Sequence, residues 1–307
     1  LTDVYGDWYS YPSHMESKNN REVFPPDDQI WVDVVEKGSN GCIMFNKEIM
    51  DAVGITPEDV QTEEGFLAAC EKVKASGHQV DGQSVLPVVL QCNLWINTSL
   101  DGIVSNTFGV LPVDDEGNYR HSELNPLYKN ALKFLNTLIQ KEYLDVNTLT
   151  IDETALKTYL DAKRVFCWIG NQAQQDKTNM PWVSYGPILA SNGAKPVIGL
   201  NGEAGTGWIQ TLVSKDCKNP EKIAKLLSWA SSREGLLVNY YGEEGTDYTI
   251  DDKGIVTRTE EGTKRLAEEY DNNVLMWPFA NTSFERHTEP VPDPASNRGV
   301  EVALMPA

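Results

Sequence analysis

The chain has 307 residues, 40% of them hydrophobic, which is enough for two lobes or one large α/β domain around a real core. Its 45 acidic residues outnumber its 26 basic residues, and the net charge of −19 would repel phosphate backbones, so we expect no nucleic-acid partner. A spanning helix needs an uninterrupted apolar run of about eighteen residues, and the sequence contains none.

The segment from residue 41 to residue 77 predicts a strand followed by two capped helices. Residues 42 to 45 form an apolar run of strand length. Asn46 is placed to cap a first helix that Gly54 ends, and Thr62 is placed to cap a second helix that Gly77 ends. The apolar face of the second helix consists of Phe66, Leu67, Cys70 and Val73.

The rest of the chain alternates helices and short strands, which indicates α/β layering rather than a sandwich or a bundle. The pair Asn125-Pro126 is typical of a helix start. A helix over 153 to 162 leads into a strand over 164 to 169, which ends at Gly170. The pair Asn219-Pro220 predicts another helix start, and the buried face of that helix is expected to contain Ile223, Leu226, Leu227 and Ala230.

The sequence contains no recognisable catalytic, metal or cofactor motif. Its five cysteines have no CxxC spacing, its four histidines are far apart, and it has no GxSxG pattern. The acidic stretches 114 to 118 and 251 to 254 lack the full calcium-loop pattern and predict hairpin turns instead. We therefore expect no metal and no cofactor. Cysteines 42, 70 and 167 lie in apolar patterns and are expected to be buried.

Tryptophans beside amides are the best candidates for a ligand site, because an aromatic face packs on a sugar ring while amides bind its hydroxyls. Trp95 follows an apolar strand, and Trp208 follows the glycine-rich stretch 201 to 207. Open α/β sheets bind ligands beyond the carboxyl ends of their strands, which favours the residues after 170. Trp168 and Trp229 are expected in the core. The candidate ligand-binding residues are Tyr11, Gln91, Asn93, Trp95, Asn171, Gln172, Trp208 and Trp277.

Five motifs occur in a fixed order along nearly the whole chain. They are GDWYSYPSH at 6 to 14, FNKEIMDAVGI at 45 to 55, ELNPLYKNALKFLNTLIQKEYLD at 123 to 145, KNPEKIAKLLSWASSREG at 218 to 235 and YYGEEGTDYTID at 240 to 251. Each motif is weak by itself. As an ordered set they resemble the extracellular solute-binding proteins of ABC transporters, of the carbohydrate-binding type. Tyr143 stands where that family usually has glycine.

The resemblance implies a periplasmic-binding-protein-like α/β fold of type II, with two lobes. It implies a partial first lobe with crossing segments at 1–40 and 205–250, and a second lobe at 41–204 and 251–307. Members carry a lipoprotein signal and roughly a hundred residues of first-lobe structure ahead of the first motif, about half a typical domain. The resemblance therefore implies a first lobe that is incomplete, in a chain truncated at its N-terminus and, we expect, at its C-terminus.

The resemblance also implies a function, which is capture of a sugar or oligosaccharide in the cleft between the lobes by hinge closure, without catalysis. The implied partners are a carbohydrate ligand and the membrane permease of an ABC importer, and we expect a monomer. The implied location is extracellular with a lipid anchor, or periplasmic. Two alternatives stay open: a glycan-cleaving enzyme that uses a pair of carboxylates about 5 to 9.5 Å apart, and a binding protein for a non-sugar solute such as a peptide or polyamine.

Overall fold

The computed structural model describes residues 10–13, 41–91, 103–114, 116–171, 181–196, 209–269, 277–279 and 284. The chain divides into two compact units. Unit 1 comprises Leu1–Glu36 and Asn201–Pro292, and unit 2 comprises Lys37–Leu200 and Asp293–Ala307. No helix among the described residues is both long and apolar enough to cross a membrane.

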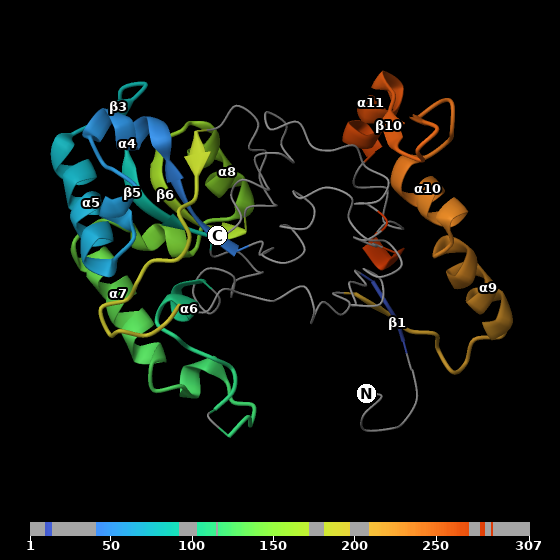
Figure 1. Cartoon of the computed structure of the whole chain (residues 1–307), viewed down its shortest axis with the longest axis horizontal. Coiled ribbons are helices and arrows are strands. Elements are labelled where there is room, and N and C mark those ends of the chain that lie inside the picture. The colour runs from blue at the N-terminus through green and yellow to red at the C-terminus, as the bar shows by residue number, and fades with distance from the viewer. Residues whose placement is uncertain are drawn as a thin grey trace. The chain divides into compact units, whose positions relative to one another are not determined.

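Unit 2 is built on a mixed four-stranded sheet with the strand order β5-β6-β2-β7. The strands are β5 (Leu86–Leu90), β6 (Val165–Asn171), β2 (Gly41–Asn46) and β7 (Trp182–Val183). β5 and β6 are parallel, whereas β2 runs antiparallel to both β6 and β7. A parallel pair needs a long crossover connection, and here helical segments between β5 and β6 supply it (Figure 1).

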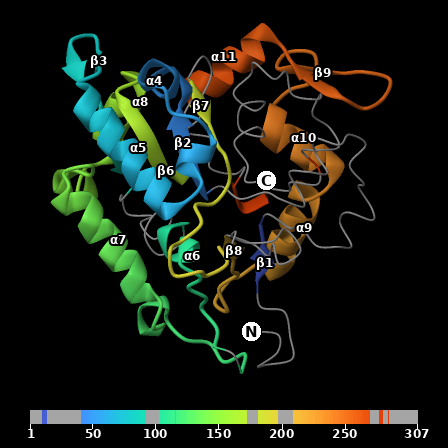
Figure 2. The ribbon, with the colours of Figure 1, turned by 60° about the vertical axis from the view of Figure 1, so that its left-hand side comes forward.

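Helices cover both faces of this sheet, as Figures 1 and 2 show. α4 (Lys47–Val53), α5 (Glu63–Ser76) and α7 (Tyr128–Gln140) pack on the face that carries Ile43, Phe45 and Val88. α8 (Glu153–Asp161) packs on the other face, with Met44, Val89 and Trp168. Successive strand residues point to opposite faces, so β2 supplies both cores. The shorter elements are η1 (Glu58–Val60), β3 (Gln79–Val80), β4 (Gln83–Ser84), α6 (Ser105–Thr107), η4 (Ser122–Leu124) and η5 (Val146–Leu149).

The predicted caps of α4 and α5 are confirmed. Asn46 accepts a hydrogen bond from the backbone of Ile49, and Thr62 accepts one from the backbone of Gly65. The glycines that end the two helices, Gly54 and Gly77, have positive φ angles of 72° and 62°. Asn46 also donates to the carbonyl of residue 163 at 3.1 Å, so it ties the end of β2 to the turn before β6.

The start of α7 differs from the prediction. The helix begins at Tyr128, not directly after Asn125. The reason is local, because the Asn125 side chain accepts a hydrogen bond from the backbone of Leu127 at 2.9 Å and thereby closes a turn ahead of the helix. The buried apolar face of α7 is otherwise as expected, with Ala131, Phe134, Leu135 and Leu138.

Tyr143 fills the space between the end of α7 and α5. Its side chain is 2% exposed, and its hydroxyl donates to the carboxylate of Glu71. The left-handed residue at this turn is Glu142, with φ 58°, so Tyr143 needs no glycine-like backbone. Burial, reinforced by the Glu71 carboxylate, raises the pKa of Tyr143 to about 12.

Replacing Tyr143 by phenylalanine is expected to lower the free energy of unfolding by about 1 kcal/mol at pH 8, because one hydrogen bond to a charged group is lost. The folded pKa is raised above the unfolded value, so the fold favours the neutral phenol. Its contribution is complete below about pH 10 and is lost as the pH rises through 12. Denaturant unfolding of both proteins should show the difference shrink over this range. Tyr119→Phe, at a 72% exposed site, should leave the pH profile unchanged; a constant difference up to pH 12 would contradict the assignment.

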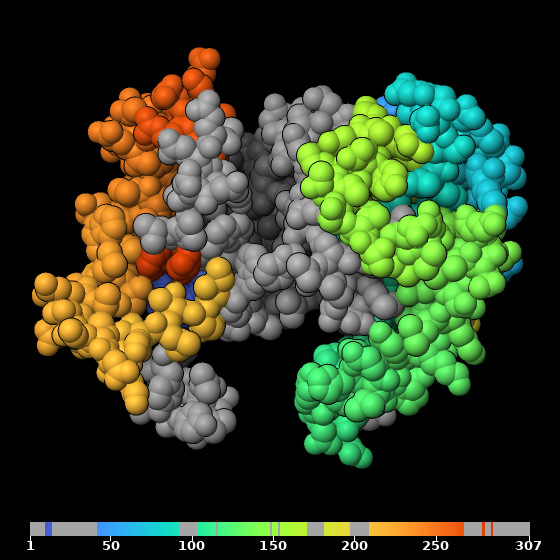
Figure 3. Space-filling view, turned by 180° about the vertical axis from the view of Figure 1, so that it is seen from behind, coloured from blue at the N-terminus to red at the C-terminus, as the bar shows by residue number. Residues whose placement is uncertain are grey.

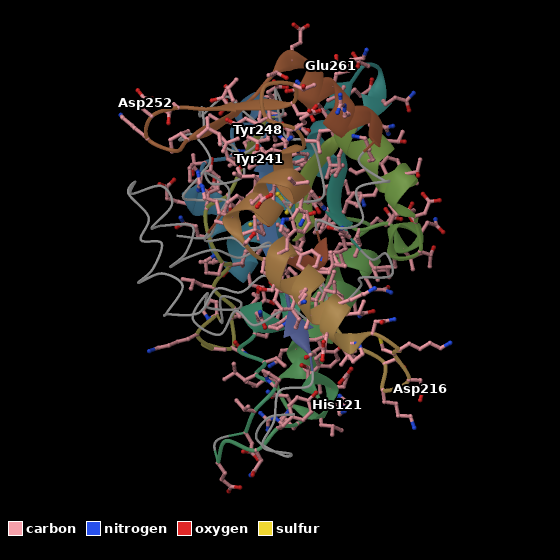
Figure 4. All side chains as sticks on the ribbon, turned by 90° about the vertical axis from the view of Figure 1, so that its right-hand side faces the viewer. His121, Asp216, Tyr241, Tyr248, Asp252 and Glu261 are labelled. Atoms are coloured by element: carbon pink, nitrogen blue, oxygen red, sulfur yellow. The ribbon has the colours of Figure 1, made fainter. Side chains whose placement is uncertain are left out.

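Unit 1 contains short strands and helices around an aromatic core. β1 (Tyr11–Pro12) pairs with β8 (Gln210–Thr211), and β9 (Tyr248–Ile250) pairs with β10 (Val256–Arg258), both antiparallel. The helices are α9 (Pro220–Ala230), α10 (Arg233–Tyr241), α11 (Glu260–Glu269) and η9 (Trp277–Phe279). Tyr241 on α10 lies next to Tyr248 on β9, with ring centroids 5.6 Å apart (Figure 4).

The structure differs from the predicted division of the chain at residue 250. The prediction placed residues 251 to 307 with the second lobe. The hairpin of β9 and β10 crosses that boundary, and residues 201 to 292 belong to unit 1. Strand pairing between the two sides of a boundary argues against it, because few contacts cross a true domain boundary. The assignment of the two units to lobes stays a proposal.

The burial of α9 also differs from the prediction. Leu226, expected on the buried face, is 53% exposed, and Trp229, expected in the core, is 40% exposed. Of the predicted apolar face, only Ala230 is fully buried. Figure 3 shows atoms of α9 at the surface of unit 1. The sequence pattern correctly predicted an amphipathic helix here, but within the described residues too little chain packs against its apolar side to cover it.

Candidate functional site

The ends of two strands meet at one edge of the sheet in unit 2. β5 and β6 are parallel, with Leu90 opposite Ile169, so their carboxyl ends lie side by side. The backbone N–H of Gln91 donates to the carbonyl of Ile169 at 3.0 Å, which extends the pairing by one residue. β2 begins at the same place, with Gly41 opposite Asn171. We call this place, where β5 and β6 end and β2 begins, the strand-end edge.

Two predicted ligand-binding residues from distant parts of the sequence, Gln91 and Asn171, come together at the strand-end edge. The Gln91 side chain is 2% exposed and lies over Gly170. A Cβ atom at Gly170 would stand 2.5 Å from Gln91 Oε1 and 2.7 Å from Gln91 Cβ, which is closer than real contacts allow. Glycine is therefore required at position 170. The buried side chain of Gln91 packs against the backbone of Gly170 at the strand-end edge.

Trp168 is buried in this part of unit 2, as predicted. It is 0% exposed, and its ring meets that of Trp182 edge-on at a centroid distance of 5.9 Å. Its Nε1 atom lies 2.7 Å from the point where a Cβ at Gly170 would stand. No acceptor for this buried N–H is found among the described residues. Sequence reasoning missed this donor, because a tryptophan inside an apolar strand carries no signal that distinguishes its ring nitrogen from the rest of the core.

In unit 1, Tyr11 lies close to the short helix η9, which contains Trp277. The Tyr11 ring packs against Phe279 with centroids 5.7 Å apart, and Phe279 belongs to the same short helix, η9, as Trp277. The Tyr11 hydroxyl is hydrogen-bonded to Ser231 at 2.8 Å. Tyr11 thus packs against the core of unit 1 and is only partly exposed.

Several predicted residues lie outside the described part of the chain. They are Asn93, Trp95, Gln172 and Trp208, together with the glycine-rich stretch 201 to 207. Of Asn171 and Trp277, the structure describes the backbone only. Their roles in ligand binding stay predictions.

The described residues give no support for a metal site or a cysteine nucleophile. Among them, no group of three or more His, Cys, Asp or Glu side chains could hold a metal ion. The acidic stretches form turns as predicted: Asp114 accepts from the backbone of Asn118 at 2.8 Å, and Asp251 accepts from the backbone of Ile255 at 2.8 Å. Burial raises the pKa of the Cys70 and Cys167 thiols, so both stay protonated and are poor nucleophiles. Cys42 is buried as well, which confirms all three predictions.

Comparison with solved structures identifies the class of fold. The layered unit with its strand-end edge, together with the α/β chain as a whole, matches the fold of solute-binding proteins, and this confirms the predicted fold class. No protein-family model matches the sequence, and no curated protein is significantly similar to it.

Three of the matched structures illustrate the likeness. One is a solute-binding protein of Bifidobacterium longum infantis described as HMO-binding and ABC-transporter associated, with 15% identity and a TM-score of 0.64 over 88% of this chain and 57% of that one. Another is the Streptococcus pneumoniae ABC-transporter substrate-binding protein FusA in complex with kestose, with 14% identity and a TM-score of 0.60 over 96% and 59%. The third is an extracellular solute-binding protein of Bifidobacterium longum subsp. infantis, with 13% identity and a TM-score of 0.58 over 94% and 64%. This chain thus spans 57% to 64% of their lengths.

Proposed function

We propose that the chain is part of the substrate-binding component of an ABC importer that captures a sugar or oligosaccharide and does not transform it. The observation that carries this proposal is the strand-end edge of unit 2, which gathers the carboxyl ends of β5 and β6 in a chain with the fold of solute-binding proteins. Ligands of open α/β sheets bind beyond such ends. The matched proteins are described by their names as binding proteins; one is called HMO-binding, and another was solved in complex with kestose.

In this proposal the ligand contacts come from residues that follow the two strands. Asn93 and Trp95 follow β5, and Asn171 and Gln172 end or follow β6. The amides would bind hydroxyls, and Trp95 would pack on a sugar ring. The Gln91 side chain is too buried to be a main ligand contact. We therefore propose that it positions the strand-end edge. Trp208, Trp277 and Tyr11, which belong to unit 1, would be further ligand contacts.

The remaining parts of the proposal concern partners and place. The partners would be the carbohydrate and the membrane permease, the location would be extracellular with a lipid anchor, or periplasmic, and the protein would be monomeric. Unit 1 would belong to the first lobe and most of unit 2 to the second. The exposed apolar side of α9 supports an incomplete first lobe, because Leu226 and Trp229 lack the cover that their pattern predicts.

The test is a ligand screen on the complete gene product. Kestose, maltotriose, cellotriose, a tripeptide and spermidine are compared by thermal shift, since a ligand that binds only the folded state raises the melting temperature. Calorimetry then measures the affinity of the best trisaccharide. Asn171→Ala and Gln172→Ala should each weaken its binding about 3- to 10-fold, the scale of one hydrogen bond. The matched controls Asn136→Ala and Gln140→Ala, at exposed positions on α7, should leave affinity unchanged.

The outcomes separate the alternatives. New reducing ends after incubation with the sugars would establish an enzyme in place of a binding protein. A shift with the tripeptide or spermidine alone would establish a non-sugar solute. A trisaccharide that binds equally well to the two variants and to the controls would refute the placement of the ligand at the strand-end edge.

A further inference from the structure

The indole nitrogen of Trp168 occupies an unusual position in unit 2. The rest of the residue belongs to the core between the sheet and α8, where Met44, Val89 and Trp182 pack around it. Residues 168 and 170 point to the same face of β6, because strand side chains alternate. Nε1 lies beside Gly170, two residues further along the strand. The ring therefore extends toward the strand-end edge, and its nitrogen, the only polar atom of the ring, lies on the side nearest that edge.

This nitrogen is a donor that lacks an acceptor. An indole N–H can only donate, and nearly all such groups find an acceptor when they are buried. Trp168 is 0% exposed, and no described residue accepts from its Nε1. An unpaired buried donor destabilises a fold, so its presence in a native structure calls for an explanation, such as a ligand or an ordered water.

The surroundings of Nε1 show where an acceptor can come from. The edge-on contact with Trp182 holds the indole ring on the core side. Over Gly170 a carbon atom is excluded, since it would lie 2.7 Å from Nε1 and 2.5 Å from Gln91 Oε1. An acceptor at the usual hydrogen-bond distance of about 2.9 Å therefore has to reach Nε1 from another side. The strand-end edge, where the proposed function places the ligand, is close to this atom, because Gly170 is one residue from the end of β6.

We propose that the Nε1–H of Trp168 is a hydrogen-bond donor in the ligand site, where an oxygen acceptor docks beside Gly170 at the strand-end edge when ligand is bound. The acceptor is either a hydroxyl of the sugar or a water held beneath it. This inference rests on the proposed function and extends it. It makes Trp168 a binding residue, makes Gly170 the residue whose missing side chain leaves room for the Gln91 amide and the Trp168 nitrogen, and leaves Gln91 as the positioning residue beside them.

The experiment compares Trp168→Phe with Trp182→Phe in the complete gene product. Both changes keep an aromatic ring in the same core and remove one indole N–H, so their effects on stability serve as each other's control. Calorimetry with the trisaccharide selected in the screen should give about 3- to 10-fold weaker binding for Trp168→Phe and unchanged binding for Trp182→Phe. Each protein must show a cooperative thermal transition before its affinity is compared.

A second measurement follows the donor itself. In ¹⁵N-labelled protein, the indole N–H signal that disappears in Trp168→Phe belongs to Trp168. Addition of the trisaccharide should move this signal downfield and slow its exchange with solvent, because a new hydrogen bond forms. Monodeoxy analogues of the sugar then distinguish the two acceptors. If a sugar hydroxyl accepts, one analogue binds more weakly to wild type but not to Trp168→Phe; if a water accepts, every analogue still moves the signal.

The possible failures are distinct. If no sugar binds to wild type, both the proposed function and this inference are wrong. If the sugar binds but the Trp168 signal does not move and Trp168→Phe binds as tightly as wild type, the inference alone is wrong. The inference alone is also wrong if the signal is already downfield and protected without ligand, because Gln91 or a permanent water would then be the acceptor.

Discussion

Replacing Phe66 by alanine is expected to lower the free energy of unfolding of unit 2 by about 3 to 5 kcal/mol, the range found for removal of a fully buried ring. Phe66 on α5 is 0% exposed. Its ring lies between Phe45 of the sheet and Phe134 of α7, at centroid distances of 6.1 and 5.9 Å. The change therefore opens a cavity where the sheet and two helices meet, and the surrounding rings are too large to close it.

Hydrogen exchange is the suitable measurement for Phe66→Ala, because a chain with two units need not unfold in one step. The slowest amides of β2 and β6 report the opening of unit 2, and they should exchange faster in the variant while amides of α10 do not. Leu132→Ala on α7, at a 47% exposed site, serves as control and should change exchange little. Equal acceleration in both variants would show that the three-ring cluster does not hold the unit together.

Replacing Asp247 by alanine is expected to destabilise unit 1 by about 2 to 3 kcal/mol, since two hydrogen bonds to a charged group are lost. Asp247 is 2% exposed, and its Oδ2 accepts from the backbone of Glu243 at 2.8 Å and from Arg265 at 3.1 Å. The carboxylate thus joins the turn after α10 to α11. Arg265 is 42% exposed and can regain water, which keeps the loss below that of a fully buried ion pair.

The matched variants for this position are Asp247→Asn and Asp252→Asn. The first keeps an acceptor for the Glu243 N–H and loses only the charge, so about half of the effect should remain. The second removes a charge at the tip of the β9 and β10 hairpin, where Figure 4 shows Asp252 directed away from the unit. It should change stability by less than about 0.5 kcal/mol. Hydrogen exchange of the α10 amides measures the stability of all three variants. If Asp252→Asn accelerated exchange as much as Asp247→Asn, net charge and not the buried contacts would explain the effect.

The interactions that the sequence predicted best are those between neighbours in the chain. The caps of α4 and α5 form where Asn46 and Thr62 stand, and both helices end at the predicted glycines. These features depend on hydrogen bonds within a few residues, which is why they can be read without the fold. At Asn125 the same local chemistry produced a turn in place of a helix cap, and the helix starts later.

The predicted core residues are buried where several helices and strands pack against them. The prediction is wrong where no such element covers the residue. Phe66, Cys70 and Trp168 are buried because strands and helices meet over them. Leu226 and Trp229 have the same apolar pattern on α9 but are about half exposed. The apolar pattern of a helix predicts which side will be buried against a neighbour, but it does not predict whether such a neighbour is present.

The sequence alone determined the class of fold, through the order of its motifs, and the type and place of most elements, through capping and periodicity. Only the tertiary structure decided which strands are neighbours. The parallel register of β5 and β6 brings Gln91, Trp168 and Gly170 to one edge, although up to 79 positions separate them in the chain. It also showed that the indole nitrogen of Trp168 ends without an acceptor among the residues described. Contacts of this kind depend on strand pairing across long distances in sequence, and residue patterns within a strand or a helix carry no information about them.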